Sequence, residues 1–208
     1  MAREPFRLER WIQPGERAVV VHGAGPRISA ALQAAGIESR FVGGRRVTTL
    51  EAIGVVREAF RLENAELSRQ IGSRAVPLMG DELGLKAELV PGLGLVGRPL
   101  PVAPQRLRAL LDGDGVPVVA PLAKGPLNVN ADDAASALAV ALGAARLVFV
   151  SDVDGVLIHG APAERLDADD VEAHRDELDG GIVPKLEAAL AAARAGIRVR
   201  VGATRIVA

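Results

Sequence analysis

Short apolar runs alternate along this chain with longer segments in which apolar residues recur every three or four positions. The runs 18–21, 116–120 and 146–150 have the length and the β-branched content that buried strands require. The helical spacing is clearest over 131–142 and 185–195, where Ala and Leu gather on one face. Because strand and helix alternate, the pattern predicts an α/β fold with a largely parallel sheet.

The rest of the chain fits the same alternation. Further helices are predicted from the turn at 22–26 to Ala35 and over 48–71, 106–111 and 164–179, with further strands over 37–42, 197–201 and 204–207. Thr48 and Glu51 have the spacing of a capping box at the start of a helix. Residues 76–104 are rich in Gly and Pro, which favours hairpins or irregular edge structure. We expect residues 1–208 to form a single domain.

Composition excludes several classes of protein. The net charge is −1, which gives no electrostatic reason to expect nucleic acid or an anionic membrane as a partner. Cysteine is absent, so disulfides and thiolate chemistry are excluded and a reducing cytoplasm is the expected location. The opening residues 1–7 have no apolar segment of the kind found in signal peptides, and no later apolar run is long enough to cross a bilayer, so we expect neither a leader nor a membrane span. We therefore expect a soluble cytoplasmic protein.

The turn Gly23-Ala24-Gly25 lies between a predicted strand and a predicted helix. Backbone amides at the start of a helix attract anions, so this turn is a candidate anion site. It is not a dinucleotide-binding fingerprint, because Ile28 occupies the position of the third glycine. A tight turn without a ligand explains the two glycines equally well.

Two polar loops follow later strands, and in a parallel sheet both would lie at the edge where ligands bind. The first is Asn128-Val129-Asn130-Ala131-Asp132, at the start of a predicted helix. Asn130 has the position of a helix cap, and capping alone would explain it. Asn128 is not needed for capping, which favours ligand binding. The second loop has the sequence Ser151-Asp152-Val153-Asp154-Gly155-Val156-Leu157.

The second loop also resembles the first motif of haloacid-dehalogenase-type phosphatases, in which Asp152 would be the nucleophile and Asp154 the acid. That family carries the motif near its N-terminus, with a long core after it. Here only residues 158–208 follow, and no acidic pair comes after Lys185. The phosphatase is therefore the alternative interpretation.

Lysine is scarce in a chain that otherwise uses arginine for positive charge. The lysines are Lys86, Lys124 and Lys185. Lys185 follows Gly180-Gly181 at the start of a predicted helix, where a compact ammonium and the helix dipole together suit a phosphate group. An ordinary surface lysine is the simpler explanation of that residue taken alone.

Taken in order, these segments resemble the amino acid kinase family from about Ala18 to the C-terminus. The segments that carry the resemblance are the glycine turn, Gly44-Arg45-Arg46-Val47-Thr48, Gly94-Leu95-Val96-Gly97, Pro117-Val118-Val119-Ala120-Pro121, the two polar loops, and Gly181-Ile182-Val183-Pro184-Lys185. The resemblance implies a three-layer αβα, carbamate kinase-like fold with a mainly parallel central sheet. It also implies a substrate-binding lobe over about 18–125, an ATP-binding lobe over about 126–208, and a homodimer.

Within the family, the resemblance points to the enzymes of arginine biosynthesis that transfer the ATP γ-phosphoryl group to the side-chain carboxylate of N-acetylglutamate. It implies that Lys185 neutralises the transferred group and that Asp132 holds lysine side chains in place. Arg46, Asn128, Asn130 and the amides of Ala24 and Gly25 would bind the N-acetylated substrate. The ATP-binding residues would be Ser151, Asp152, Val153, Asp154, Gly155, Val156 and Leu157. Mg²⁺ would be held mainly by the phosphates of ATP, without a protein metal ligand.

Two departures from the family affect the expected activity. The family's first strand carries a Lys-x-Gly-Gly motif whose lysine contacts the transferred group, whereas this sequence has no lysine before Lys86. Ala24 also replaces the middle glycine of the turn. We expect a slow or inactive kinase unless another cation substitutes. Lys124 is the first candidate, although a solvated loop lysine is the simpler explanation of that residue, and Arg7 and Arg10 are less suitable because a guanidinium replaces a compact ammonium poorly. The alternatives are the lysine-pathway kinase of an aminoadipate derivative and a non-catalytic relative that binds nucleotide or amino acid.

Overall fold

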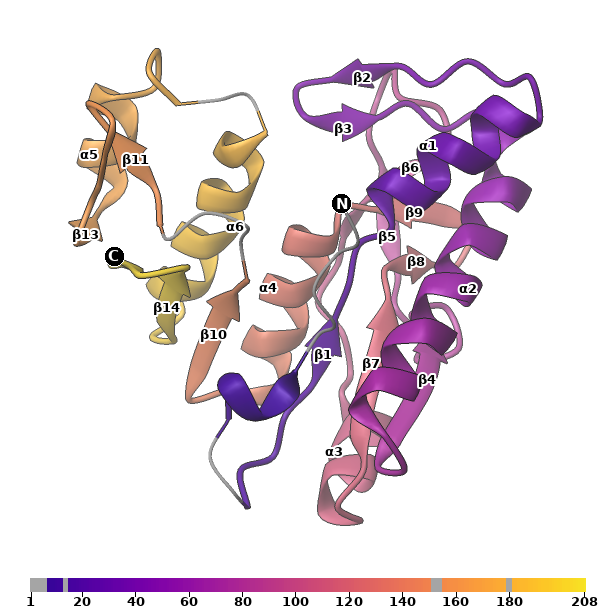
Figure 1. Cartoon of the computed structure of the whole chain (residues 1–208), viewed down its shortest axis with the longest axis horizontal. Helices are drawn as coiled ribbons and strands as arrows, with labels where there is room; N and C mark the ends of the chain where they lie inside the picture. Colours follow the sequence, from indigo (N-terminus) through magenta and orange to yellow (C-terminus); the bar gives the residue numbers. More distant parts are fainter. Residues whose placement is uncertain (1–6, 13–14, 151–154, 179–180) are drawn as a thin grey trace. The chain divides into compact units, whose positions relative to one another are not determined.

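The computed structural model describes residues 7–12, 15–150, 155–178 and 181–208 (Figure 1). Its contacts divide the chain into two compact units: Met1–Arg40 with Arg46–Ala131, and Phe41–Arg45 with Asp132–Ala208. The sequence placed the division between residues 125 and 126. That the first unit binds the amino acid and the second binds ATP stays a prediction.

A fully parallel sheet in the order β1-β7-β4 forms one part of the first unit. Its strands are β1 (Val20–Val21), β7 (Val116–Ala120) and β4 (Ala75–Met79). The helices of this unit are η1 (Leu8–Arg10), α1 (Gly25–Ala34), α2 (Ala52–Ile71) and α3 (Gln105–Asp112). Every residue of β7 is buried, because α2 and α3 both pack against this strand. Such burial explains why 116–120 reads as a continuous apolar run.

A second sheet of this unit has the strand order β5-β6-β9-β8. Its strands are β5 (Ala87–Leu89), β6 (Val96–Pro99), β9 (Leu127–Val129) and β8 (Leu122–Ala123). β6 and β9 are parallel, with Val96 opposite Asn128, and the two outer pairs are antiparallel. This register places Asn128 beside the segment that follows Gly94.

The second unit has a four-stranded sheet in the order β10-β14-β15-β13 and a hairpin of β11 and β12. Its strands are β10 (Arg146–Phe149), β11 (Leu157–Ile158), β12 (Ala161–Pro162), β13 (Arg165–Leu166), β14 (Arg198–Val201) and β15 (Thr204–Ile206). Its helices are α4 (Ala131–Leu142), α5 (Ala168–Ala173) and α6 (Ile182–Arg194). β2 (Phe41–Val42) and β3 (Arg45–Arg46) form a further hairpin. The fold class is α/β with mostly parallel strand pairing, as predicted.

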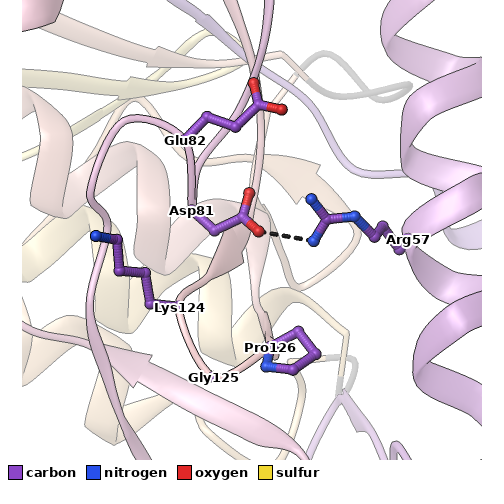
Figure 2. Close-up of a pocket in the computed structure, with 6 residues that line it drawn as sticks. All are labelled: Arg57, Asp81, Glu82, Lys124, Gly125 and Pro126. Atoms are coloured by element: carbon purple, nitrogen blue, oxygen red, sulfur yellow. Dashed lines mark hydrogen bonds and ion pairs between the residues drawn. The ribbon is translucent and has the colours of Figure 1, made fainter.

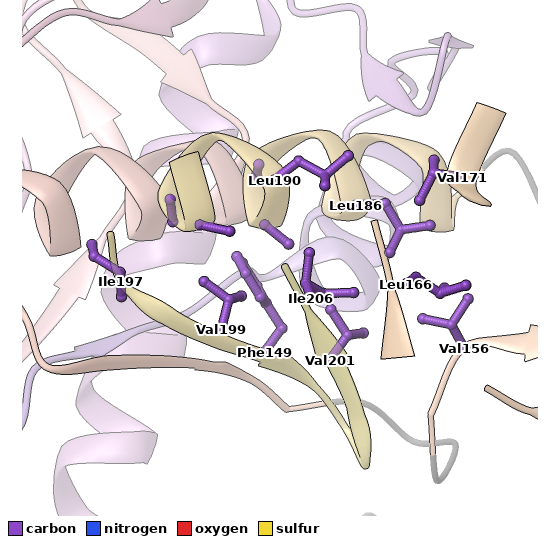
Figure 3. Packing of buried hydrophobic residues seen from close by; sticks show 14 of the residues in the cluster. Phe149, Val156, Leu166, Val171, Leu186, Leu190, Ile197, Val199, Val201 and Ile206 are labelled. Carbon is purple, nitrogen blue, oxygen red and sulfur yellow. The ribbon is translucent and has the colours of Figure 1, made fainter. Parts of the chain in front are cut away.

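The core of the second unit lies between α6 and its sheet (Figure 3). α6 packs against β14, β15 and β10, and its inward face includes Leu186 and Leu190. Ala189 and Ala193 lie on the same face by helical spacing, so the rest of this face is made of methyl groups, and Ala188 and Ala192 are buried elsewhere on the helix. Because alanine side chains are short, the helix backbone lies close to the strands. Close packing of this kind fixes the position of α6, which carries Lys185.

Three sequence-based expectations about local structure were wrong. The helix predicted over 164–179 is the short α5, because Asp167 and Asp170 form a capping box that starts the helix after β13. The segment 76–104 contains the end of β4, which pairs in parallel with β7, although it also contains the expected hairpin of β5 and β6. Thr48 does not cap α2: the hydroxyl of Thr49 accepts a hydrogen bond from the amide of Ala52, at 3.1 Å.

Within the described parts of the chain, no helix is long and apolar enough to span a bilayer.

Candidate active site

Lys185 and Asp132 form a close ion pair in the second unit. The Lys185 ammonium donates a hydrogen bond of 2.6 Å to Asp132 Oδ1, and the side chains are 20% and 22% exposed. Asp132 lies in the first turn of α4, and Lys185 lies near the start of α6. The same ammonium lies 5.1 Å from the centre of the Phe149 ring, within the range of a cation–π contact. Carboxylate and ring together orient the only lysine of this unit.

A second ion pair lies on the next residue of α4. Arg45 contacts Asp133 at 2.9 Å, and the two side chains are 16% and 14% exposed. Both acidic residues are in the first turn of the helix, where carboxylates are stabilised by the positive end of the dipole. The pairs therefore resemble each other in burial and helix position, but Asp132 contacts a lysine and Asp133 an arginine.

The glycine turn of the first unit joins β1 to α1. Gly23 lies close to Ala131, because a methyl group at Gly23 would be 3.7 Å from the Ala131 Cβ. Ala24 is buried, and its carbonyl accepts a hydrogen bond from the Ile28 amide at 2.8 Å. A methyl group at Gly25 would meet nothing within 4 Å. The turn is therefore open at Gly25 and packed at Ala24.

Arg46 is held against the start of α1 by several hydrogen bonds. Its guanidinium donates to the Gly25 carbonyl at 3.1 Å, to the Ser29 hydroxyl at 2.9 Å, and to the Ser39 hydroxyl. Only 7% of the residue is exposed, and burial lowers the pKa of Arg46. An arginine nevertheless keeps its charge at neutral pH, because its ordinary pKa lies far above neutrality. The first unit thus places a fixed cation beside the glycine turn.

Asn128 is connected to Arg46 through Thr48. The Asn128 amide nitrogen donates to the Thr48 hydroxyl at 3.0 Å, and that hydroxyl donates to the Arg46 carbonyl at 3.2 Å. Thr48 is fully buried, and its backbone bonds to Leu93 and Leu95. Gly94 allows this close approach because its φ is +72° and an added methyl group would be 2.4 Å from the Thr48 carbonyl oxygen. Three predicted substrate-binding residues, Gly25, Arg46 and Asn128, therefore belong to one hydrogen-bonded network.

His22, at the end of β1, is a buried polar residue that sequence reasoning did not assign to the site. Its Nδ1 lies 3.2 Å from the Gly23 carbonyl oxygen, and its ring meets the Phe60 ring edge-on. Among the described residues, none hydrogen-bonds to His22 Nε2. Burial, the largest effect, lowers the pKa of His22 below 6.5. The imidazole is therefore neutral at neutral pH.

The predicted ATP-binding loop is described only in part. Ser151, Asp152, Val153 and Asp154 lie outside the described residues. Gly155 and Val156 pack against Thr204: a methyl group at Gly155 would be 2.7 Å from the Thr204 hydroxyl, and the Val156 amide donates to that hydroxyl at 2.9 Å. Val156 is buried in the core and Leu157, at the start of β11, is 46% exposed. Packing explains Gly155 and Val156 without a ligand, so their contact with ATP stays a prediction.

Lys124 lines a cavity of about 520 Å³ in the first unit (Figure 2). The other lining residues are Arg57, Asp81, Glu82, Gly125 and Pro126. Arg57 and Asp81 form an ion pair of 2.7 Å within it. Among the described residues that line this cavity, none belongs to the predicted site. These contacts therefore give no support to the idea that Lys124 takes the place of the missing family lysine.

The site residues that sequence reasoning missed share one property. Thr48, Ser29 and His22 act through side-chain contacts with residues distant in sequence, which local periodicity does not reveal. Thr48 was interpreted as a helix cap. The position of Asn130 at the end of β9, directly before α4, agrees with either capping or substrate binding.

The order of strands and helices, together with the lysine–aspartate pair and the arginine at the glycine turn, defines a class of phosphotransferase. A model of the amino acid kinase family matches residues 7–203, and the chain belongs to this family. Membership excludes the haloacid-dehalogenase-type alternative.

Known proteins resemble the chain over most of its length. It is 42% identical over 200 residues to an acetylglutamate kinase from Rubrobacter xylanophilus, covering 91% of this chain and 79% of the relative. The crystal structure of smu.665 from Streptococcus mutans superposes with a TM-score of 0.86 at 29% identity, covering 93% of this chain and 86% of that one. Carbamate kinase from Giardia has the same fold, with a TM-score of 0.69 at 15% identity, covering 93% and 84%. The predicted amino acid kinase fold is confirmed.

Proposed function

We propose that this protein transfers the γ-phosphoryl group of ATP to the side-chain carboxylate of N-acetylglutamate, as a step of arginine biosynthesis. The observation that carries the proposal is the 42% identity to an acetylglutamate kinase across 91% of the chain. The Lys185–Asp132 pair and the Arg46 network support it, because they lie at the positions to which the family resemblance assigns catalysis and substrate binding.

The main obstacle in this reaction is charge. A carboxylate must approach a triphosphate, so catalysis depends on positioning and on cations around the transferred group. Lys185 is assigned to the transferred phosphoryl group, and Asp132 keeps the ammonium in one orientation through the bond of 2.6 Å. Mg²⁺, held mainly by the phosphate oxygens of ATP, supplies further neutralisation of charge. The surroundings of Lys185 fit the phosphate groups of ATP, because a compact ammonium at a helix start suits phosphate oxygens.

Substrate binding is assigned to the first unit. Arg46 suits the α-carboxylate, because a guanidinium binds a carboxylate through two parallel hydrogen bonds. The Gly25 amide suits another oxygen of the substrate, since the space beside Gly25 is open. Asn128 and Asn130 complete the proposed set, and the Thr48 hydroxyl holds the Asn128 amide in place. The loop 151–157 is assigned to ATP.

Trapping of the acyl phosphate with hydroxylamine tests the proposal directly. We expect hydroxamate to form only when Mg-ATP and N-acetylglutamate are both present, and each ligand to raise the thermal midpoint, since a ligand specific for the native state stabilises it. No hydroxamate, with midpoint shifts for both ligands, would support a non-catalytic binding protein. No shift and no product would contradict the proposal. Faster turnover with the N-acetylated aminoadipate homologue would favour the lysine-pathway alternative.

Two adjacent arginines provide a matched test of substrate binding. Arg46→Lys removes the bidentate geometry, so we expect a higher KM for N-acetylglutamate with an unchanged KM for ATP. Arg45→Lys changes the neighbouring residue, whose partner is Asp133, and should leave both KM values close to wild type. Equal effects of the two substitutions on the KM for N-acetylglutamate would refute the assignment of Arg46. The cytoplasmic location and the homodimer stay predictions, and sedimentation equilibrium would test the latter.

A further inference from the structure

Two histidines and a glutamate converge in the second unit, and none of the three is assigned to the kinase reaction. His159 lies in the turn between β11 and β12, and His174 and Glu177 follow α5. One potential ligand atom from each lies within 4.8 Å of the others. His159 Nδ1 is 3.0 Å from the Glu177 carboxylate, and the two imidazole rings meet edge-on with their centres 5.3 Å apart.

The surroundings of the cluster orient these side chains. His174 Nδ1 lies 2.8 Å from the Asp170 carbonyl oxygen, a bond that places the ring proton on Nδ1 and leaves the Nε2 lone pair for a ligand bond. Histidines that bind metals commonly use their second nitrogen in this way. His159 adopts a left-handed backbone with φ of 52°, which is uncommon outside glycine, and its amide donates to Glu177 Oε2 at 3.1 Å. Backbone and side chain of His159 are thus both turned towards Glu177.

We propose that His159, His174 and Glu177 bind a borderline divalent transition metal ion, with Zn²⁺ as the best match. Two imidazoles and one carboxylate form a typical three-residue zinc set, and water completes the tetrahedron. Zinc ligands lie about 2.0–2.2 Å from the ion and so roughly 3.3 Å from one another. Side-chain rotation closes the separation of 4.8 Å, since the side chain of His159 is 74% exposed and that of Glu177 is 38% exposed.

This site differs in chemistry from the Mg²⁺ that accompanies ATP. Mg²⁺ prefers oxygen ligands in octahedral geometry, whereas imidazole favours Zn²⁺, Co²⁺, Ni²⁺ and Cu²⁺. The ion would connect the β11–β12 turn to the segment after α5. Gly155-Val156-Leu157 leads directly into β11, so the metal would restrain the end of the predicted ATP-binding loop. A metal that binds only the native state also raises its stability.

Titration of the untagged full chain with Zn²⁺ tests the inference. The experiment uses isothermal calorimetry in excess Mg²⁺, after removal of bound metal with a chelator. We expect one saturable site per chain, a raised thermal midpoint, and a Co²⁺ complex with the strong visible absorption of four-coordinate geometry. His159→Ala and His174→Ala should each weaken binding at least about tenfold, because each removes a ligand. Thermal midpoints in chelator would show whether each variant is folded.

Two controls distinguish this site from general surface binding. Glu172→Gln removes an exposed carboxylate of α5 that pairs with Arg175, and His22→Gln removes the remaining histidine of the chain. Both variants should bind Zn²⁺ as the wild type does. Glu177→Gln keeps the size of the third ligand and should weaken binding without unfolding. Weak binding that no variant changes, or no saturable Zn²⁺ binding in excess Mg²⁺, would overturn the proposal.

Discussion

The contact between Lys185 and Asp132 leads to a prediction in which activity and stability respond differently. Replacing Lys185 by Met removes the ammonium assigned to the phosphoryl group, which lies over Phe149, and keeps an unbranched side chain of similar length. Loss of one fixed electrostatic stabiliser typically lowers kcat by a factor on the order of 10² to 10³, about 3–4 kcal/mol in the barrier. We expect Lys185→Met to cause a loss of this size.

The expected effect on folding is much smaller. Coulomb attraction between two charges a few ångströms apart is about 1 kcal/mol in water and about 4 kcal/mol near a protein surface. Desolvation and side-chain ordering offset most of it, so exposed pairs usually contribute about 0–1 kcal/mol. Lys185 and Asp132 are about one-fifth exposed, so we expect a loss near the upper end of that range. Urea unfolding of the wild type and Lys185→Met measures it.

Asp132→Asn and Asp133→Asn form the matched comparison, assayed by hydroxamate trapping. Each removes one carboxylate charge from the first turn of α4, at similar burial. Asp132→Asn should lower kcat about tenfold or more, because the ammonium loses its orienting partner, while Asp133→Asn should keep most of the activity. Equal losses in the two variants, or a Lys185→Met enzyme with more than a tenth of wild-type kcat, would refute the assignment.

The remaining predictions concern stability, measured as urea midpoints. As the pH falls below 6.5, His22→Gln should lose less stability than the wild type. In the wild type, the unfolded histidine takes up a proton that the buried one, with its lowered pKa, resists, so acid favours unfolding; parallel pH curves of the two proteins would contradict this. Gly94→Ala should cost about 1–3 kcal/mol more than Gly92→Ala, since both have positive φ but only Gly94 faces a backbone oxygen. Asn64→Ala should cost about 2–3 kcal/mol, because Asn64 donates to carbonyls of β4 and β7; a loss below 0.5 kcal/mol, roughly the level of a neutral surface substitution, would exclude that role.

The sequence predicted best the elements whose pattern is set by burial. The helix over 131–142 has the predicted bounds, because its apolar face and polar start both appear in the sequence. The run 116–120 is a buried strand for the same reason. α5 was overestimated, since amphipathic spacing over 164–179 gave no sign that the local capping box begins the helix only at Ala168.

The candidate site was predictable to a different degree. Lys185 and Asp132 are 53 positions apart, and only the family resemblance suggested that they meet. Arg46 and Asn128 were assigned in the same way, but the connecting role of Thr48 was missed, because a threonine before a helix has the same local pattern whether it caps or pairs at long range. Sequence periodicity identifies faces of elements, whereas these contacts depend on the tertiary arrangement within each unit.

Under the proposed role of Lys185, the alanine face of α6 would make turnover adjustable from buried positions of the helix. Ala189 and Ala193 act as spacers of minimal thickness on the face of the helix that carries Leu186 and Leu190. One added methylene at either position would push the helix outward or tilt it, and Lys185 would move with its backbone. An evolving or engineered enzyme could therefore alter the placement of its ammonium in small steps, by changing the size of a buried side chain while the charged residues stay the same.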